Sequence, residues 1–188
     1  MTLPNPILYD PSRHKPLLSQ LASIHASCIL QDGTLASFIP TRQKTGRLTI
    51  DHLKLVNFWL AYNQQVEEGS RAIVLQFADE SEEVVAGVVS LYMPGTETGP
   101  FRSEVHKLLV SPQHRFKGIA RRLMGRLEEV ARESGRGLVM LDTTIGSGAE
   151  LVYPKLGYIV FGDVPKYGIH PLTGELVDER WFYKDLRG

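Results

Sequence analysis

The sequence has a single cysteine among its 188 residues, Cys28. One thiol excludes an intrachain disulfide and a zinc site built from several thiolates. The apolar residues around Cys28 recur at helical spacing, so we expect it to fill space in a core rather than act as a nucleophile. The six histidines show neither HxxxH nor HxH spacing, and no metal is therefore expected.

An excess of charge of either sign is also missing, because 21 Lys and Arg residues balance 21 Asp and Glu residues. No dominant field would attract nucleic acid or an anionic membrane. Long apolar runs are absent, since no stretch approaches a membrane span without carrying charge. The first residues, MTLPNPILYDPSRHK, lack the basic start and apolar run of a secretory signal. We therefore expect a cytoplasmic protein with neither nucleic acid nor a membrane as its partner.

What is present is the composition of an ordinary globular protein, with 43% hydrophobic and 22% charged residues. A chain of this length fits one domain over residues 1–188. Helical spacing of apolar residues predicts a helix from Lys15 to Asp32, and another from Thr49, a candidate N-cap, to Glu68. A polar loop is expected between these two helices.

The rest of the chain alternates between β-rich runs and helical patterns. Strands are predicted at residues 6–9, 71–77, 84–92, 104–110, 138–142, 158–161 and 180–186. The second and third of these runs are typical of an antiparallel hairpin, and a loop through Pro165 is expected between the last two. A short helix is predicted at 149–156. Such interleaving favours a mixed sheet flanked by helices.

The clearest helix is predicted from Gly118 to Ser134, and it follows a basic stretch, Arg115-Phe116-Lys117. A helix start exposes unpaired backbone N–H groups and the positive end of the helix dipole. Because Gly118 has no Cβ, a ligand could approach that backbone closely. The pattern indicates an anion site suited to a pyrophosphate. A helix that merely begins after a basic loop is the alternative for this stretch alone.

Residues 104–158 resemble the core of the GNAT family of N-acetyltransferases. The stretch 115–120 matches the family signature, which is Arg or Gln, two residues, Gly, one residue, then Gly or Ala. The strand HKLLV, the long helix, the strand LVMLD and the segments AELVY and KLGY follow in the family's order. More narrowly, EVHKLLV, LDTTIGSGAE and the tail from GDVPKYG to FYKDL are similar to the bacterial tabtoxin-resistance acetyltransferases. The resemblance is weak before about Arg71.

The resemblance implies an α+β GNAT fold, whose mixed, mostly antiparallel sheet of six to seven strands opens near Val110 and carries helices on both faces. It implies acetyl-CoA as co-substrate and direct transfer, in a ternary complex, to a small primary amine or amino-acid-like acceptor such as a toxin or antibiotic. Two alternatives stay open: a protein lysine or N-terminal acetyltransferase, and a catalytically silent acyl-CoA-binding module. The resemblance also allows a homodimer.

The same resemblance implies a coenzyme site made largely of main chain. The strand at residues 108–110 would offer its edge to the pantetheine arm, and an N–H near its end would stabilise the oxyanion. The amides of residues 115–120 would hold the pyrophosphate, and Ser147 would bond the coenzyme where many members have Asn. The expected coenzyme-binding residues are Leu108, Leu109, Val110, Arg115, Phe116, Lys117, Gly118, Ile119, Ala120 and Ser147.

Three residues acquire catalytic roles through the resemblance. Glu104 and Asp142 are expected to assist removal of the amine's proton, and Tyr153 to protonate or bond the departing thiolate. Each has a structural alternative: an exposed strand-end carboxylate, a turn or cap residue, and a core aromatic, respectively. His106 and His114 flank the same region, and a surface or core position is the default for both.

Overall fold

The computed structural model describes residues 3–187, and most of its strands belong to one seven-stranded sheet with the order β1-β4-β5-β6-β7-β9-β8. Its strands are β1 (Ile7–Leu8), β4 (Arg71–Phe77), β5 (Val85–Tyr92), β6 (Arg102–Val110), β7 (Leu138–Thr144), β8 (Ile159–Ile169) and β9 (Leu176–Asp185). All neighbours in this sheet are antiparallel except β6 and β7, which run parallel. The predicted mixed, mostly antiparallel sheet is confirmed.

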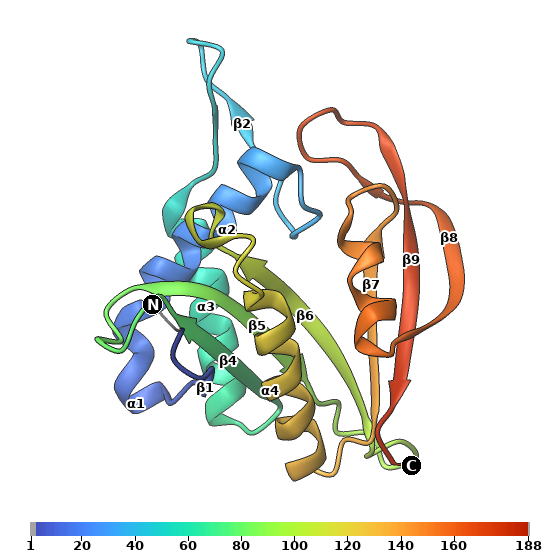
Figure 1. The fold of residues 1–188 in the computed structure, drawn as a ribbon. Helices are drawn as coiled ribbons and strands as arrows, with labels where there is room; N and C mark the ends of the chain where they lie inside the picture. Colours follow the sequence, from blue (N-terminus) through green and yellow to red (C-terminus); the bar gives the residue numbers. More distant parts are fainter. Residues whose placement is uncertain (1–2, 188) are drawn as a thin grey trace.

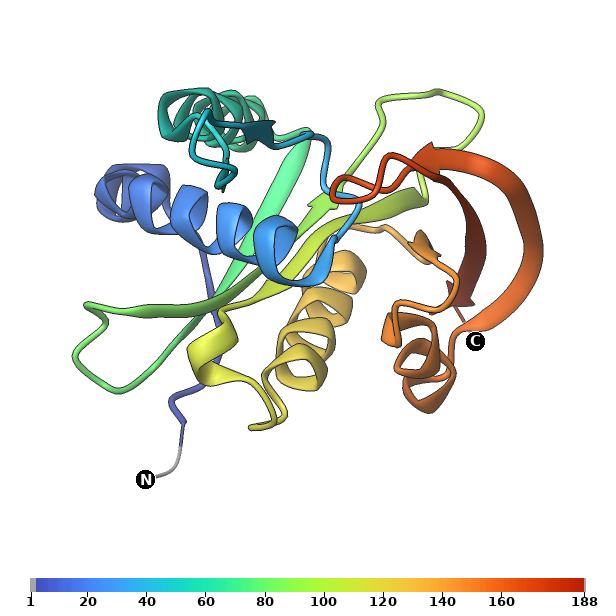
Figure 2. The same cartoon turned by 90° about the horizontal axis from the view of Figure 1, so that it is seen from above.

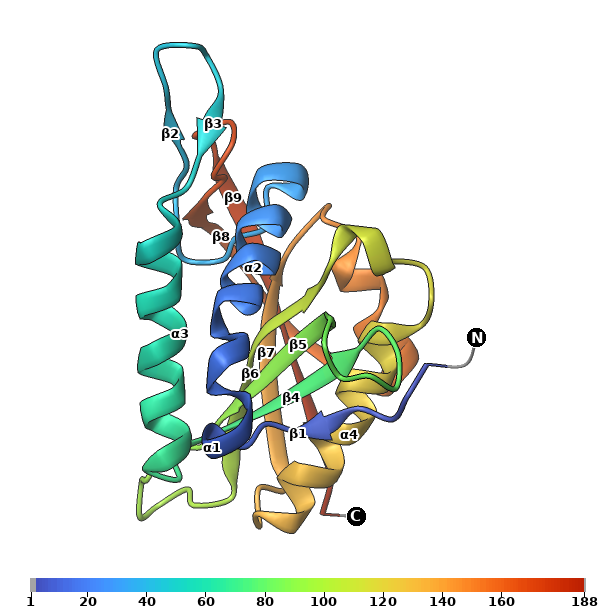
Figure 3. The same cartoon turned by 90° about the vertical axis from the view of Figure 1, so that its left-hand side faces the viewer.

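Helices cover both faces of the N-terminal half of the sheet (Figures 1 and 3). Helices α2 (Leu18–Asp32) and α3 (His52–Glu67) pack on one face, and α4 (Ile119–Glu133) packs on the other. The short α1 (Pro11–His14) and η1 (Lys15–Leu17) lead into α2. Strands β4 and β5 are buried along almost their whole length because both faces are covered. Among residues 3–187, no helix combines the length and the apolar character that crossing a membrane requires.

Local capping explains where the first long helices begin and end. Gly33, in the left-handed conformation at φ 67°, closes α2, and its N–H donates to the carbonyl of Ile29. Helix α3 begins after Asp51, whose Oδ1 accepts from the Leu53 N–H at 2.9 Å. The prediction of Thr49 as the N-cap was therefore wrong. Thr49 lies instead in β3 (Leu48–Thr49), which pairs with β2 (Thr41–Arg42) in a small hairpin that interrupts the predicted loop.

A β-bulge reverses the two faces of β6 partway along the strand. Val88 pairs with Leu109 and Ser90 with His106, so Lys107 and Leu108 both stand opposite Val89. Lys107 takes a left-handed φ of 58° at this point. As a result, Val105 packs in the core on the α4 side, whereas Leu109 packs on the α2 and α3 side. In a regular strand, Val105 and Leu109 would lie on the same face because they are four residues apart.

The sheet opens between β6 and β7, as predicted. The two strands pair only from Arg102 with Leu138 to Glu104 with Met140. Beyond these pairs they diverge, and Figure 2 shows β8 and β9 curving away with β7 from the rest of the sheet. The edge of β6 from residue 105 to residue 110 therefore faces a gap rather than a neighbouring strand.

Two predictions near the C-terminus were wrong because of proline. β8 continues past Pro165 to Ile169, where a loop was predicted. β8 is the sheet's outer strand, so a missing N–H is tolerated there, and a register shift between Val164 and Gly168 absorbs the irregularity. The predicted helix at 149–156 forms two 3₁₀ helices, η3 (Ala149–Leu151) and η4 (Tyr153–Leu156), since Pro154 disfavours a continuous α-helix.

Candidate functional site

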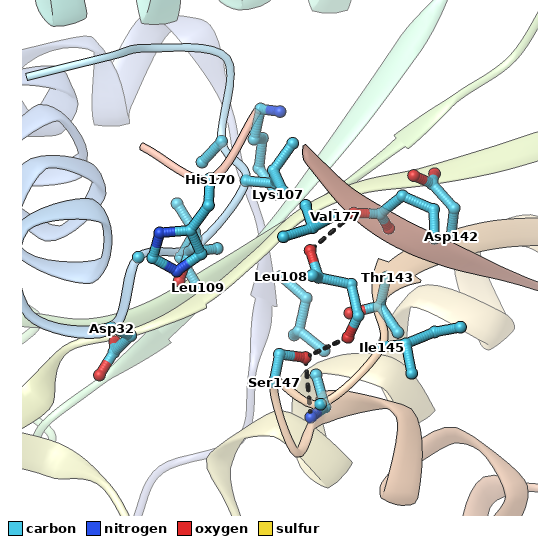
Figure 4. Close-up of a pocket in the computed structure, with 18 of the residues that line it drawn as sticks. Asp32, Lys107, Leu108, Leu109, Asp142, Thr143, Ile145, Ser147, His170 and Val177 are labelled. Carbon is cyan, nitrogen blue, oxygen red and sulfur yellow. Dashed lines mark hydrogen bonds between the residues drawn. The ribbon is translucent and has the colours of Figure 1, made fainter. Parts of the chain in front are cut away.

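Two adjoining cavities occupy the gap between β6 and β7. The large cavity, of about 570 Å³, extends from β6 to β7, β9 and the tip of the β8–β9 hairpin. Figure 4 shows its lining. The small cavity, of about 440 Å³, extends from the end of β6 to the start of α4. The residues that line both are Asp32, Thr34, Leu108, Leu109, Arg115, Ala149 and Tyr153.

The start of α4 gives the small cavity a row of main-chain donors. Among residues 3–187, no backbone or side-chain acceptor receives a hydrogen bond from the N–H groups of residues 115–121. The first amide of this helix that does donate is that of Arg122, to the carbonyl of Gly118. Gly118 is the N-cap at φ 74°, and Phe116, two residues earlier, is also left-handed and fully exposed. This turn directs the positive end of a 15-residue helix toward the cavity.

The basic side chains around this turn have different tasks. The guanidinium of Arg115 is bound by the carboxylate of Asp32, with Nη1 2.7 Å from Oδ1, and this pairing raises the pKa of Arg115. Arg122 binds Gln76 and the carbonyl of Pro4. Arg115 therefore links the turn before α4 to α2, and Arg122 links α4 to β4 and the N-terminal segment. Lys117 and Arg121 are exposed.

The end of β6 forms the wall between the cavities and the α2 helix. Leu109 is buried, and Leu108 and Val110 are half-buried. The Cys28 thiol lies 3.5 Å from the carbonyl oxygen of Val110, and burial raises the pKa of this thiol to about 11. Cys28 is therefore a neutral, buried residue at neutral pH, in agreement with its predicted role as core filling.

Two carboxylates from neighbouring strands line the large cavity. Asp142 on β7 is half-buried, and burial raises its pKa, while the ammonium of Lys107 opposes that shift. Lys107 projects from the bulge on β6 into the same cavity, and burial lowers its pKa. Its ammonium makes no hydrogen bond or ion pair within the described part of the chain. The cavity thus presents charges of both signs.

Glu179 on β9 is the second carboxylate, and sequence analysis missed it. Only 1% of the residue is exposed. Its Oε1 accepts from the Thr144 hydroxyl at 2.6 Å, whereas its Oε2 has no hydrogen-bond partner among residues 3–187. Burial, with a smaller contribution from the charge of Asp142, raises its pKa to about 7. The last strand was predicted to start at Arg180, which left Glu179 in a loop.

Tyr153 stands where the two cavities meet. It is buried, it begins η4, and its ring packs against Tyr158 and Phe182. Burial, followed by the charges of Asp142 and Glu179, raises its pKa above the ordinary value for a phenol. The hydroxyl therefore stays protonated at neutral pH, which a proton donor requires.

Glu104 lies apart from these groups. It occupies the last paired position of β6 and β7 and lines neither cavity. Its carboxylate lies 3.3 Å from Nε2 of His106. Nδ1 of that ring lies 3.4 Å from the Arg71 guanidinium, so the Nε2–H is free to donate to Glu104. Burial, then the Arg71 charge, lowers the pKa of His106. The catalytic role of Glu104 stays a prediction.

Ser147 lines the large cavity and not the small one. Its hydroxyl donates to the Thr144 carbonyl at 2.7 Å and accepts from the Ala149 N–H at 3.3 Å. These bonds order the loop between β7 and η3 (Figure 4). A coenzyme contact from Ser147 stays a prediction.

The β8–β9 hairpin reaches across the large cavity to the loop after α2. His170, just after β8, packs on Gly33, where a Cβ would lie 2.4 Å from the imidazole. A Cβ on Gly168 would likewise lie 2.4 Å from Leu35. Leu172 and Thr173 donate their N–H groups to Nδ1 of His170, which orients the ring. The two glycines allow the hairpin tip and the α2 loop to meet over the cavity.

Comparison with known sequences gives a family match over most of the chain. Residues 23–158 match the sequence model of the acetyltransferase (GNAT) family. The chain is 33% identical over 70 residues to the L-amino acid N-acyltransferase MnaT of Escherichia coli, which is 36% of this chain and 41% of that protein. The chain spans between 20% and 41% of the length of the curated relatives it matches.

Comparison with solved structures confirms the predicted fold. The structure of yncA from Salmonella typhimurium with its cofactor acetyl-CoA superposes with a TM-score of 0.74 at 18% identity, covering 100% of this chain and 96% of that chain. A phosphinothricin acetyltransferase from Sinorhizobium meliloti in complex with acetyl-CoA gives a TM-score of 0.71 at 19% identity, covering 99% and 89%. The narrower resemblance to tabtoxin-resistance enzymes stays a prediction.

Proposed function

Because the chain belongs to the acetyltransferase (GNAT) family, we propose that it transfers an acetyl group from acetyl-CoA to a small primary amine in the cleft between β6 and β7. The observation that carries this proposal is the placement of free main-chain amides at residues 115–121 beside a cavity lined by Asp142, Glu179 and Tyr153. Acetyl-CoA, when bound, supplies the acetyl group as an activated thioester.

The small cavity holds the coenzyme in this proposal. The free amides before and within the first turn of α4 bind its pyrophosphate, assisted by the helix dipole. The exposed Lys117 and Arg121 add positive charge beside them. The open edge of β6 at residues 108–110 pairs with the amide groups of the pantetheine arm as an added strand would. The fit is supported by donors that no acceptor within residues 3–187 engages.

The large cavity holds the acceptor. The ammonium loses a proton to a carboxylate there, and the amine nitrogen attacks the carbonyl carbon, so a C–N bond forms and the C–S bond breaks. A backbone N–H near Leu109 or Val110 stabilises the oxyanion. Tyr153 gives its proton to the sulfur and regains one from the nitrogen, which its raised pKa favours.

The acceptor is an amino-acid-like compound in this proposal. A volume of about 570 Å³ falls within the range of small-molecule pockets. Lys107 on one side and Asp142 with Glu179 on the other suit a molecule that carries both a carboxylate and an ammonium. Relatives named as an L-amino acid N-acyltransferase and a phosphinothricin acetyltransferase support the same class. A toxin or antibiotic of this class is included.

Thiol release from acetyl-CoA tests this function. The purified protein is assayed with amino acids, polyamines, and peptides that offer only a lysine or only an N-terminus. Release with amino acids and not with peptides supports the proposal. Release with peptides alone would assign a protein acetyltransferase, and tight coenzyme binding without release from any acceptor would assign a silent acyl-CoA-binding module.

A further inference from the structure

We propose that Glu179 is a catalytic residue that takes the proton from the acceptor's ammonium through its oxygen Oε2, with Asp142 as the neighbouring charge that holds the cation. The inference rests on the proposed acetyl transfer and names the base for it. Neither the family signature at residues 115–120 nor the predicted catalytic set includes Glu179.

Strand register places the two carboxylates on the same side of the sheet. Thr144 pairs with Glu179 across β7 and β9, and directly opposite residues share a face. Asp142 lies two residues before Thr144 on β7 and therefore points to that same face. All three line the large cavity, and Figure 4 labels Asp142 on this lining. An ammonium in this cavity can therefore meet both carboxylates.

The hydrogen bonds of Glu179 leave one oxygen available. Thr144 fixes the carboxylate by donating to Oε1 at 2.6 Å. Oε2 is buried with no partner among residues 3–187, and no Lys, Arg or His forms an ion pair with it there. An unpaired, buried carboxylate oxygen is costly and rare in proteins. A cationic acceptor would supply both the missing hydrogen bond and the missing charge.

The other candidates for the base are less suited. Burial raises the pKa of Asp142, but the ammonium of Lys107 opposes that shift. Glu179 forms no ion pair with a cation among residues 3–187. Glu104 lies outside both cavities and is engaged with His106. Besides Glu179, the titratable groups that line the large cavity are Asp32 at the end of α2, His106 and Lys107 on β6, Arg115 before α4, Asp142 on β7, Tyr153 on η4 and His170 on the hairpin. Outside this lining, the charge of Glu104 on β6 acts on Asp142, and Tyr167 on β8 feels the charge of Glu179.

The proton transfer balances without any further reactant. An N–H bond of the ammonium breaks, an O–H bond forms at Oε2, and the nitrogen keeps the electron pair with which it attacks. The acid form of Glu179 then releases its proton to water. A pKa of about 7 in the free protein, raised mainly by burial, suits a base that works near neutral pH.

The variant Glu179→Gln tests the assignment, because it keeps the acceptor oxygen for Thr144 and removes the basic one. We expect kcat/KM for the amine to fall by about 100-fold, while the dissociation constant for acetyl-CoA stays unchanged. In the parent protein, kcat/KM should rise with pH through a midpoint near 7, and this rise should be lost in Glu179→Gln. Asp185→Asn, on an exposed carboxylate of the same strand, is the matched control with unchanged kinetics.

Thr144→Val separates proton transfer from a structural role. It removes the hydroxyl that favours the ionised carboxylate, so the midpoint should move to higher pH while the rate at high pH is largely retained. A Glu179→Gln protein that keeps both its rate and its pH profile would overturn the assignment, as would loss of the profile in Asp142→Asn instead. If the parent protein releases no thiol with any amine, the proposed transferase function itself is wrong. If the parent and Glu179→Gln are equally active, the transferase function stands and only the assignment of Glu179 is wrong.

Discussion

The two walls of the cleft differ in what they offer a ligand. The wall made by the end of β6 and the start of α4 presents main-chain groups, and the half of the sheet behind it is buried under helices on both faces. The wall made by β7, β9 and the hairpin tip presents charged and hydroxyl side chains. Its outer strand β8 is exposed along most of its length.

The difference suggests that one wall binds the coenzyme and the other binds the acceptor and moves its proton. Main-chain donors depend on backbone conformation, so the first wall tolerates changes in side chains and suits the coenzyme. Side chains can change one at a time, so the second wall suits the choice of acceptor and the proton chemistry. In this account, a mutation on one wall should alter either coenzyme binding or amine turnover, and not both.

The largest expected effect is on turnover. Tyr153→Phe should reduce kcat by about 100-fold or more, because the thiolate would leave without a proton donor. The dissociation constant for acetyl-CoA, measured by calorimetry, should stay unchanged. An unchanged kcat across the whole pH range would remove the tyrosine from the chemistry.

A change on the main-chain wall should weaken acetyl-CoA binding and leave amine turnover at saturating acetyl-CoA unchanged. Gly118→Val places a β-branched residue at φ 74°, at a strain of about 1–2 kcal/mol, which corresponds to about 5–30-fold weaker acetyl-CoA binding if the turn shifts to relieve it. Gly46→Val is the matched control, because Gly46 has φ 83° and equally open space, in the β2–β3 hairpin. Equal coenzyme affinity in the two variants would argue against a ligand at the α4 turn.

The buried carboxylate should also affect stability. The pKa of Glu179 rises from 4.5 to about 7 on folding, so the folded state binds more protons and loses stability as pH increases over that window. The loss should be about 3 kcal/mol at most. Urea unfolding should show Glu179→Gln gaining more stability relative to the parent protein at pH 8 than at pH 5. Buried His25, whose pKa is lowered to about 4, gives an opposite slope that is common to both proteins. If the free energies of unfolding of Glu179→Gln and the parent protein differ by the same amount at pH 5 and pH 8, Glu179 does not have the raised pKa described here.

The smallest expected effect concerns the hairpin tip. Gly33→Ala puts a Cβ 2.4 Å from His170 at φ 67°, and should cost about 1 kcal/mol in stability. Because the imidazole must move, KM for the amine should rise while acetyl-CoA affinity does not. Adding His170→Ala should relieve the clash with the imidazole but not the backbone strain at φ 67°. If KM is unchanged in both variants, the tip does not shape the acceptor site.

The main-chain wall could be predicted from the sequence because its signals are local. The apolar stripe of α4, the turn at Gly118 and the hairpin of β4 and β5 each lie within a short stretch, and all three predictions were confirmed. The bulge at Lys107 could not be predicted, since a lysine gives no sign of a positive φ. The reversal of faces along β6 depends on that one residue.

The side-chain wall was predicted only in part because it depends on pairing between distant segments. Asp142 and Tyr153 were named through the family resemblance, and both line the large cavity. Glu179 was missed because Pro165 indicated a loop and the last strand was predicted to start at Arg180, whereas β9 begins four residues earlier, at Leu176. Only the register of Thr144 against Glu179 reveals that this acid faces the cleft.

The central claim, that the free amides at the start of α4 bind a coenzyme independently of the acidic wall, is tested most directly by calorimetric titration with acetyl-CoA. We predict one site per chain, with affinity weakened in Gly118→Val and unchanged in Glu179→Gln. Absence of binding to the parent protein, or equal weakening by the two substitutions, would contradict the account.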